Sequence, residues 1–549
     1  MDTFSFFKRN EILQNLREKH YDLLIIGGGI TGAGIALDAS SRGLRTALVE
    51  KSDFAFGTSS RSTKLIHGGL RYLKQLEFGL VKEVGSERAV VHNLAPHLVL
   101  PEKMLLPLSE KKGLGYWLTS VGLKVYDWLA GVKPEDQRRM LSKLQTLKSE
   151  PLLKKDDVKG GALYAEYRTD DARLTIEIIK RAVEHHADIL NYVRAADFTY
   201  ERGMITGVVA ADQLTGQSFS IHAKAVVSAA GPWVDDLREI NKSKEGKSLH
   251  LTKGVHVVVP FEKLPVLQAI YFDVEDGRMI FAIPRGRITY IGTTDTNYNE
   301  DKDHVVATST DAAYLINAVN ATFPTVHLNV SDIESSWAGL RPLIHEEGKS
   351  ASELSRKDEI FESPTGLISI AGGKLTGYRK MAERVVNLVV KKHVSDRTVG
   401  GCQTEKLKIT DPSFEDIREV RRYISEIHQQ LKRYNFPETI SMELVSTFGK
   451  RTHDIVKHFI NGSQHDHPEL SLLKAVAFFT IHHEMVVTLQ DFFVRRTGMM
   501  YFDLPRVLRW KDEVASEFAT LLSWDENRKR QELEGVMFLA ASLTSCKIV

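Results

Sequence analysis

The sequence of 549 residues predicts an α/β fold with three parts: a dinucleotide-binding domain, a second domain built on an antiparallel sheet, and an all-helical C-terminal domain. An apolar strand that runs into a glycine-rich turn near the N-terminus predicts the first part. Strand-like runs between turn residues predict the second over 252–345, and helical periodicity beyond about residue 400 predicts the third. A chain this long exceeds one hydrophobic core, which agrees with several domains.

The glycine-rich turn, Gly27-x-Gly29-x-x-Gly32, follows the first apolar strand directly. A helical run occupies residues 33–41, and a second apolar strand follows over 45–49. Strand, turn, helix and second strand in this order form the full context of a Rossmann-like dinucleotide fingerprint, whereas the glycine pattern alone would be a weak signal.

Each residue of the fingerprint has a physical role. Gly27 permits the tight turn, Gly29 lets the backbone approach a pyrophosphate, and Gly32 lets the helix pack closely on the strand. The pyrophosphate then lies at the helix N-terminus, where free N–H groups favour negative charge. Glu50, at the end of the second strand, is expected to accept hydrogen bonds from the adenosine ribose and to disfavour the 2′-phosphate of NADP.

Composition limits the class of protein. The chain is 42% hydrophobic and 26% charged with a net charge of +2, which is typical of a globular protein and argues against nucleic acid as a main partner. Its two cysteines have no metal or redox spacing, so we expect neither a metal site nor a disulfide framework. The longest apolar run, 23–37, is shorter than the ~20 residues that cross a bilayer, and residues 1–20 resemble no secretory signal. We expect a cytoplasmic protein, either soluble or peripheral on the inner face of the plasma membrane.

Residues 160–231 indicate a helix followed by short strands. The predicted elements are a helix over 171–186, strands near 189–193, 204–210 and 217–223, and a buried apolar run over 225–230. Such a three-stranded excursion, which returns to the parent sheet, is common in FAD proteins and unusual in folds that bind only NAD. The sequence therefore favours FAD as the dinucleotide.

Later segments complete the two sheets. Strands over 256–259, 279–283 and 288–292 suit a mostly antiparallel, substrate-facing domain. An apolar strand at 366–370 runs through Gly372 and Gly373 into a helix over 378–392. We therefore predict that the FAD-binding domain is discontinuous and that its last strand and helix come from this distant segment.

The predicted division assigns every segment to one of three domains. The C-terminal part contains helical runs such as 414–433 and 469–487. The boundaries are 18–75, 159–245 and 356–398 for the FAD-binding domain, 76–158 and 246–355 for the cap or substrate domain, and 399–549 for the C-terminal helical domain.

The loop over 57–72 is rich in small hydroxyl residues and paired glycines, which let the backbone approach a flat ring and phosphates. It could instead be a polar surface loop, but Ile66 and Leu70 flank its His-Gly-Gly turn and indicate partial burial. His67 in that turn is a candidate general base, because a base works best with a pKa near ambient pH.

Several separate motifs together resemble the FAD-dependent glycerol-3-phosphate dehydrogenase family. They lie at 59–72, 230–233, 291–295, 339–343, 372–380 and 491–497, and the resemblance spans nearly the whole chain. It implies oxidation of sn-glycerol 3-phosphate to dihydroxyacetone phosphate, with hydride passing from C2 to flavin N5 and electrons to a membrane quinone. Related oxidases reduce oxygen and carry an insertion that is not seen in this sequence.

The resemblance and the chemistry suggest catalytic residues. His67 is the first candidate base and His256 the second, while Arg341 would stabilise negative charge on the substrate oxygen. A lone histidine is more often structural, and a lone arginine is more often a solvated surface charge. Membership of a family motif reverses this expectation for the arginines, whereas a structural role for His67 stays open beside the catalytic one.

The resemblance also implies two sets of binding residues. Cations suit a dianionic phosphate, and the predicted substrate residues are Arg71, Tyr72, Arg341, Arg356 and Lys374. The predicted FAD residues are Gly27, Gly29, Ile30, Thr31, Gly32, Glu50, Lys51, Thr58, Ser59, Ser60, Ser62, Lys64, Leu65, Gly68, Gly69, Leu70, Ala230, Gly231, Gly373, Lys374, Leu375 and Thr376. The 373–376 turn opens a helix, whose N–H groups can stabilise a reduced flavin.

Alternatives remain open from sequence alone. An amine or hydroxy-acid oxidase of the same superfamily would need one carboxylate clamp instead of several cations, and a flavin-binding regulatory protein would need no catalytic histidine. The basic aromatic segment 115–130 fits either a helix lying on a membrane or a cap helix packed on the core. The oligomeric state, a homodimer included, and the role of the C-terminal domain are also open.

Overall fold

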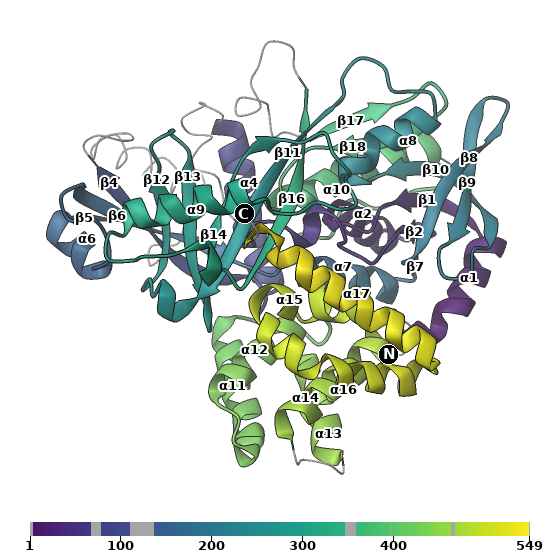
Figure 1. Cartoon of the computed structure of the whole chain (residues 1–549). Coiled ribbons are helices and arrows are strands. Elements are labelled where there is room, and N and C mark those ends of the chain that lie inside the picture. The colour runs from purple at the N-terminus through teal and green to yellow at the C-terminus, as the bar shows by residue number, and fades with distance from the viewer. Residues whose placement is uncertain are drawn as a thin grey trace.

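Two mixed sheets and a block of helices make up the chain in a computed structural model that describes residues 4–66, 78–109, 137–345, 358–395, 397–462 and 467–547. Figure 1 shows the sheets side by side in the upper half of the molecule, with the C-terminal helices packed beneath both. This is the predicted fold class, with an FAD-type α/β domain, a mostly antiparallel second domain and a helical C-terminal part.

The first sheet contains the predicted dinucleotide-binding strands. They lie in the order β17-β18-β10-β1-β2-β7, and each neighbouring pair except β17–β18 is parallel. The bounds are β1 His20–Ile26, β2 Thr46–Val49, β7 Asp188–Leu190, β10 Ser218–Ser228, β17 Glu359–Glu362 and β18 Leu367–Ala371. Because β18 pairs with β10, the predicted discontinuity of this domain is confirmed.

Helices cover this sheet and explain its apolar strands, which are buried on both faces. α2 (Ile30–Ser41) packs against both α7 (Asp171–Glu184) and α10 (Tyr378–His393). The other helices that precede the C-terminal block are α1 Arg9–Glu18, α4 Phe78–Leu94, α6 Lys143–Ser149, α8 Val234–Ile240 and α9 Ser309–Thr322.

Two strand predictions in the excursion need correction. The strand near 189–193 is really the end of β7 and the start of a separate strand, β8 (Val193–Glu201), because Tyr192 turns the chain at φ 56°. The runs 217–223 and 225–230 belong to one strand, β10. Its first half pairs with β9 (Met204–Asp212) and alternates in exposure, whereas its second half is buried between β1 and β18. The change of pattern therefore marks a change of burial and not a strand end.

The second sheet is antiparallel apart from the β12–β4 pair, as predicted. Its strands are β3 Leu65–Ile66, β4 Leu100–Ser109, β5 Arg139–Ser142, β6 Val158–Arg168, β11 Leu249–Pro260, β12 Ala269–Asp273, β13 Met279–Arg285, β14 Ile288–Gly292, β15 Thr296–Asn297 and β16 Ser335–Ile344. Alternate valines of β11 pack with α9 in one core on its outer face. β6 pairs with β3, β4 and β5, so residues 158–168 belong to the second sheet, and the chain enters the first sheet again after residue 170.

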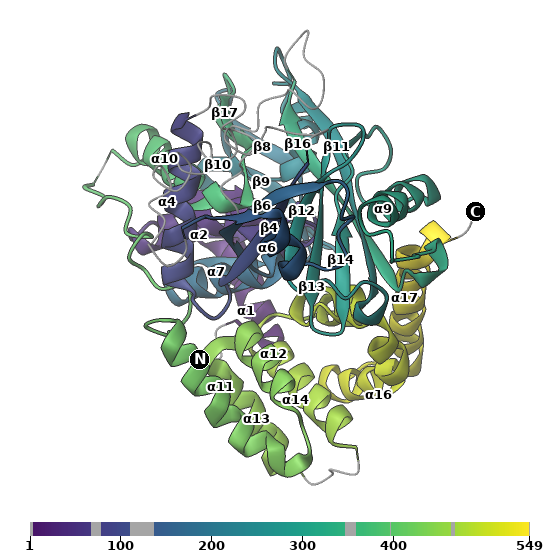
Figure 2. The same cartoon turned by 90° about the vertical axis from the view of Figure 1, so that its left-hand side faces the viewer.

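The C-terminal helices share a hydrophobic core with the second sheet. They are α11 Ile417–Leu431, α12 Glu438–Phe448, α13 Thr452–Asn461, α14 Pro468–His483, α15 Met499–Phe502, α16 Leu504–Leu522 and α17 Glu526–Thr544, with a π-helical turn over Asp491–Arg496. Figure 2 shows α17 rising from this block beside the second sheet, where it contacts β16. No helix within the described ranges is long and apolar enough to cross a bilayer.

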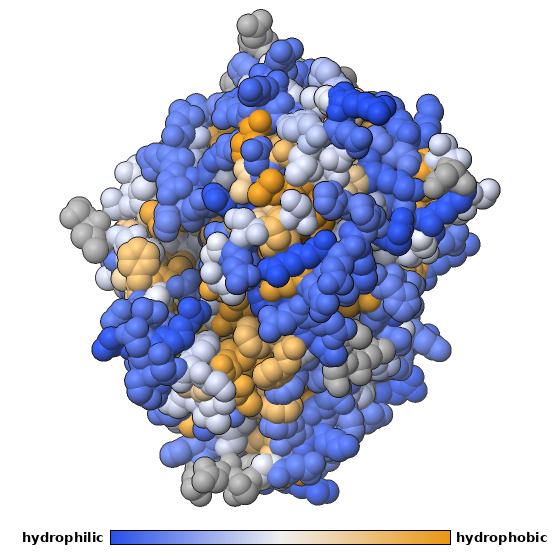
Figure 3. All heavy atoms as spheres, turned by 90° about the vertical axis from the view of Figure 1, so that its right-hand side faces the viewer, coloured by the Kyte–Doolittle hydropathy of each residue, from blue (hydrophilic) through white to orange (hydrophobic). Residues whose placement is uncertain are grey.

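The surface is largely polar. Figure 3, which views the right-hand side of Figure 1, shows a hydrophilic face with a band of apolar side chains through its centre. The polar majority agrees with a chain of which 26% is charged.

His97 is a fully buried imidazole between α4 and the C-terminal helices. Its ring packs on Phe414 with 5.4 Å between centroids, and neither ring nitrogen has a hydrogen-bond partner among the residues that the structure describes. Burial, with smaller effects from Arg173 and Lys180, lowers the pKa of His97 to about 3. The imidazole is therefore neutral at pH 7.

Acid should destabilise the fold through His97. The unfolded chain binds a proton below about pH 6.5 that the folded chain does not, so stability falls as pH decreases, by up to about 1.4 kcal/mol per pH unit. We expect the melting temperature of His97→Leu to fall less than that of the parent protein between pH 7 and pH 5, as measured by circular dichroism. The exposed His327 gives the control, His327→Gln, which should follow the parent. Equal losses in all three proteins would contradict this role.

Candidate active site

The glycine turn admits no side chain at two positions. Gly27 has φ +112°, and a Cβ there would lie 2.6 Å from the carbonyl oxygen of Ala229. A Cβ on Gly32 would lie 1.9 Å from the carbonyl oxygen of Gly27. Only glycine lets α2 begin this close to β1. The first N–H groups of α2 therefore border the sheet edge where a pyrophosphate is expected.

Glu50 and Ser59 complete this edge. The Glu50 carboxylate accepts hydrogen bonds from the N–H groups of Gly28 (2.7 Å) and Ser52 (2.9 Å), while Ser59 Oγ accepts from the N–H of Ile30 (2.9 Å). Burial raises the pKa of Glu50, and the two N–H donors oppose that rise. Backbone N–H donors, a carboxylate acceptor and a hydroxyl beside a glycine turn fit the ADP half of FAD.

The carboxyl ends of parallel strands bring other predicted FAD segments to the same edge. Ala230 and Gly231 follow β10, and Gly231 has φ +54°. The 373–376 segment follows β18, where a 3₁₀ turn over Leu375–Gly377 leads into α10. Residues that lie hundreds of positions apart in the sequence thus share one edge with the glycine turn.

The segment 58–66 joins this edge to the second sheet. Thr58 Oγ1 donates to the Leu340 carbonyl oxygen (2.7 Å), and the Trp337 indole donates to that of Ser62 (3.1 Å). His256 Nε2 shares a hydrogen bond with Thr63 Oγ1 (3.0 Å). The predicted FAD residues of this segment therefore lie against strands of the predicted substrate domain, and Figure 1 shows β11 and β16 at the centre of the molecule.

Lys64, another predicted FAD residue, is fully buried. Its ammonium binds Asp171 Oδ1 (2.5 Å) and the Ser60 carbonyl oxygen (3.1 Å). Asp171 also accepts from the Ser62 N–H at 2.9 Å. This charge pair holds the 58–66 segment to the start of α7.

Glycines clear the face of the second sheet that meets this segment. A Cβ on Gly339 would lie 2.5 Å from the carbonyl oxygen of Arg61, one on Gly292 would lie 2.1 Å from the His256 ring, and one on Gly254 would lie 2.3 Å from Arg341 Nη2. Glycine weakens a strand, so its use here is explained by the room that these groups need.

Arg341 and His256 therefore lie on one face of the sheet, on the adjacent strands β16 and β11. Arg341 donates to Thr293 Oγ1 (3.0 Å), the Thr294 carbonyl oxygen (3.2 Å) and Asp295 Oδ1 (3.1 Å). These contacts fix its guanidinium while leaving the side chain 22% exposed. It can therefore meet an anion.

His256 is buried and stacks on Trp337 with 4.7 Å between ring centroids. Burial, helped by the charges of Arg341 and Lys64, lowers the pKa of His256 well below its usual value. The imidazole is neutral at pH 7, which suits a hydrogen-bonding role beside the segment 58–66.

Some predicted residues lie outside the described ranges. They are His67, Gly68, Gly69, Leu70, Arg71, Tyr72, Arg356 and the aromatic segment 115–130. Sequence reasoning gave no role to Thr293–Asp295, although the motif 291–295 was recognised, and it did not single out Gly254 or Gly292. A glycine within a strand has no local signal that shows which side chain occupies the space beside it.

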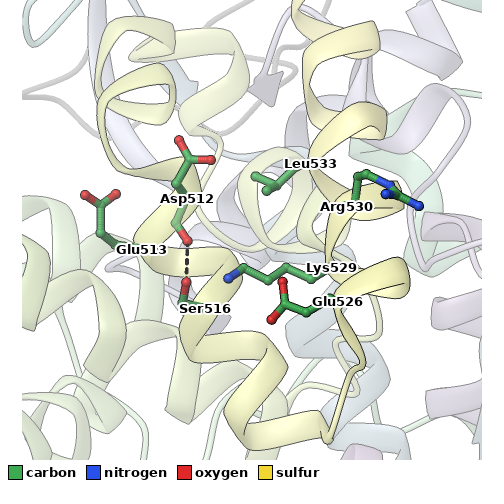
Figure 4. A pocket seen from close by; sticks show the side chains of 7 residues that line it. All are labelled: Asp512, Glu513, Ser516, Glu526, Lys529, Arg530 and Leu533. Atoms are coloured by element: carbon green, nitrogen blue, oxygen red, sulfur yellow. Dashed lines mark hydrogen bonds between the residues drawn. The ribbon is translucent and has the colours of Figure 1, made fainter.

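A groove between α16 and α17 is not part of this site. Figure 4 shows its lining, with Lys529 and Glu526 of α17 lying toward Ser516 and Asp512 of α16. Asp512, Ser516 and Glu526 are exposed, and the groove lies wholly within the C-terminal helices. We assign it no function.

Two family profiles match the chain. One, described as FAD dependent oxidoreductase, covers residues 22–378, and the other, described as the C-terminal domain of alpha-glycerophosphate oxidase, covers 402–529. An aerobic glycerol-3-phosphate dehydrogenase of Staphylococcus aureus is 50% identical over 524 residues, which is 95% of this chain and 94% of the relative.

Solved structures agree with these matches. A glycerol-3-phosphate dehydrogenase from Bacillus halodurans, complexed with FAD, superposes with a TM-score of 0.84 at 42% identity and covers 98% of both chains. An L-alpha-glycerophosphate oxidase from Mycoplasma pneumoniae matches with a TM-score of 0.56 at 19% identity, over 71% of this chain and 98% of that one, and so shares the fold.

Replacement of Gly32 should impair flavin binding. In Gly32→Ala the added Cβ would force α2 away from the turn, so we expect FAD affinity to fall at least about tenfold, which corresponds to about 1.4 kcal/mol. Flavin absorbance per purified protein and titration of the deflavinated protein measure this. Gly79→Ala in α4 is the control, because its Cβ would meet no atom of the described residues within 4 Å. Equal flavin content in the two variants would contradict the prediction.

Proposed function

We propose, since the chain belongs to the FAD-dependent glycerol-3-phosphate dehydrogenase family, that it oxidises sn-glycerol 3-phosphate to dihydroxyacetone phosphate and passes the electrons to a membrane quinone. The observation that carries this proposal is a fixed guanidinium, that of Arg341, beside His256 on the sheet face that packs against the FAD domain. Glycerol metabolism is the corresponding physiological role.

The cofactor is FAD. We propose that the glycine turn and Glu50 hold its ADP half, and that residues of the segments 58–65 and 373–376, with Lys51, Ala230 and Gly231, hold the remainder. When bound, FAD supplies the acceptor for a hydride, at N5 of its ring. The protein must then bind the phosphate, orient the alcohol and remove its proton.

Arg341 suits the binding of a charged substrate. Its planar fork presents several donors, and Thr293, Thr294 and Asp295 already fix its direction. We propose that it contacts the substrate and stabilises negative charge on the reacting oxygen, and that Arg71, Tyr72, Arg356 and Lys374 contribute to phosphate binding.

We propose that His67 accepts the hydroxyl proton. His256 is the second candidate, but a base whose pKa lies far below ambient pH is a weak proton acceptor. The hydrogen bond between His256 and Thr63 supports a different role, that of orienting the segment that leads directly to His67.

A quinone acceptor requires the protein to approach a membrane, since quinones dissolve in the lipid phase. We propose a cytoplasmic protein with peripheral contact, and the aromatic segment 115–130 is the proposed contact. A homodimer is a further proposal, to be tested by sedimentation.

Anaerobic reduction tests the proposed function. We expect the yellow holoenzyme to bleach on addition of glycerol 3-phosphate and to keep its colour with glycine or lactate. Quinone should then restore the colour faster than oxygen does. No bleaching by glycerol 3-phosphate would contradict the proposal, and faster return with oxygen would identify an oxidase.

Arg341 gives a residue-level prediction. We expect Arg341→Ala to retain FAD but to lower kcat/KM for glycerol 3-phosphate at least about 10²-fold, because a donor to the reacting charge is lost. The kcat/KM of Arg341→Lys should lie between those of the parent protein and Arg341→Ala, since lysine keeps the charge but not the planar set of donors. Arg194→Ala, at an exposed position of β8, is the control. Turnover by Arg341→Ala equal to that of this control would refute the role.

A further inference from the structure

The motif 491–497 has no part in the proposed reaction, yet its side chains reach the FAD domain. Residues Asp491–Arg496 form a buried π-helical turn in the C-terminal domain. Arg495 and Arg496 both point to Asp53, which follows β2 and lies three positions after Glu50. The C-terminal domain thus contacts the loop that carries the predicted ribose-binding acid.

Asp53 is completely buried and fully engaged. It accepts hydrogen bonds from Arg495 Nε (2.5 Å), Arg496 Nη1 (2.7 Å), Arg496 Nη2 (2.9 Å) and Asn191 Nδ2 (3.0 Å). Burial alone would raise the pKa of Asp53, but the two guanidinium groups outweigh it and lower the pKa to about 2. The carboxylate is therefore charged, and its interactions are the strong, charge-assisted kind.

The loop held in this way closes on the glycine turn. The N–H of Ala55 donates to the Gly28 carbonyl oxygen (3.0 Å), and the Gly28 N–H donates to Glu50 (2.7 Å). The N–H of Phe56 donates to the Asp53 carbonyl oxygen at 3.1 Å. The backbone N–H and C=O of Gly28 are therefore both hydrogen-bonded to the loop 50–56, and Asp53 lies at the middle of that loop.

A second carboxylate, that of Asp491, holds Arg495. Asp491 Oδ1 accepts from Arg495 Nη2 and from the Tyr192 hydroxyl, both at 2.7 Å. The backbone N–H of Tyr192 in turn donates to the Ser52 carbonyl oxygen at 2.9 Å. Two separate routes thus connect the π-helical turn to the loop 50–56, one through Asp53 and one through Tyr192.

We propose that Arg495 and Arg496 are positioning residues for FAD: by holding Asp53, they set the loop 50–56 and with it Glu50 and Gly28 in the arrangement that receives the ADP half. The C-terminal domain then contributes to cofactor binding without touching the cofactor. This inference rests on FAD as the cofactor and not on the substrate proposed above.

Removal of one member of a buried pair leaves the other charge uncompensated, so the loop should move or admit water. We expect Asp53→Asn to raise the FAD dissociation constant at least about tenfold. Arg496→Lys keeps the positive charge but loses the bidentate contact with Asp53, so it should raise the FAD dissociation constant by a smaller factor. Ser336→Ala is the control, because it removes a buried hydrogen bond (2.7 Å) from the second sheet to the Leu543 carbonyl oxygen of the same C-terminal domain, away from the loop.

The measurement is fluorescence titration of deflavinated protein with FAD, at a temperature where circular dichroism shows each variant folded, together with the KM for glycerol 3-phosphate at saturating FAD. Weaker FAD binding in Asp53→Asn and Arg496→Lys, with an unchanged KM and unchanged FAD affinity in Ser336→Ala, supports positioning. A lower melting temperature with unchanged FAD affinity means that the pair only joins domains and overturns the proposal. If Asp53→Asn does not fold, the FAD affinity of Arg496→Lys tests the proposal: weaker binding supports it and unchanged binding overturns it.

Because FAD titration needs no substrate, it separates the two proposals. Absence of turnover with glycerol 3-phosphate in every protein, combined with the expected FAD affinities, would contradict the proposed substrate and leave the positioning role supported.

Discussion

Gly339 has room for only a hydrogen atom beneath the backbone of Arg61, and this contact governs how the FAD domain meets the second sheet. The segment 58–66 could not approach β16 if that residue had a side chain. Trp337, on the same face, then reaches the Ser62 carbonyl oxygen. With the two surfaces this close, Arg341 and His256 lie next to the segment that precedes the proposed base, so the site depends on the missing side chains of the sheet.

Buried charge pairs stabilise the two loops of this arrangement. Lys64 with Asp171, and Asp53 with Arg495 and Arg496, place paired charges under the two loops that border the FAD edge. Such pairs add little net stability over an apolar core, but they define direction, because a buried charge needs its partners at hydrogen-bond distance. The aromatic residues of α15 also lie near the Lys64 ammonium, so both loops rest on the C-terminal domain.

Local features were predictable from sequence, and so was the return of the strand near 366–370 to the first sheet, but side-chain contacts between distant segments were not. The glycine turn and Glu50 form a short-range motif, and its structure follows from the demands of one turn. The Asp53–Arg496 pair joins residues 443 positions apart, and no local pattern identifies such partners. The division of β10 into two predicted strands arose in the same way, since its pattern reflects which neighbours cover each half. The proposed base and three of the substrate residues lie in segments that the structure does not describe, so their roles rest on the family resemblance.

The most direct test of the central claim is a crystal structure of the FAD-loaded protein with glycerol 3-phosphate. The account predicts substrate on the face of the second sheet that carries Arg341 and His256, with the Arg341 guanidinium within hydrogen-bond distance of a substrate oxygen. Substrate bound on the opposite face, toward α9, or at a place where Arg341 keeps only its contacts to Thr293, Thr294 and Asp295, would contradict it.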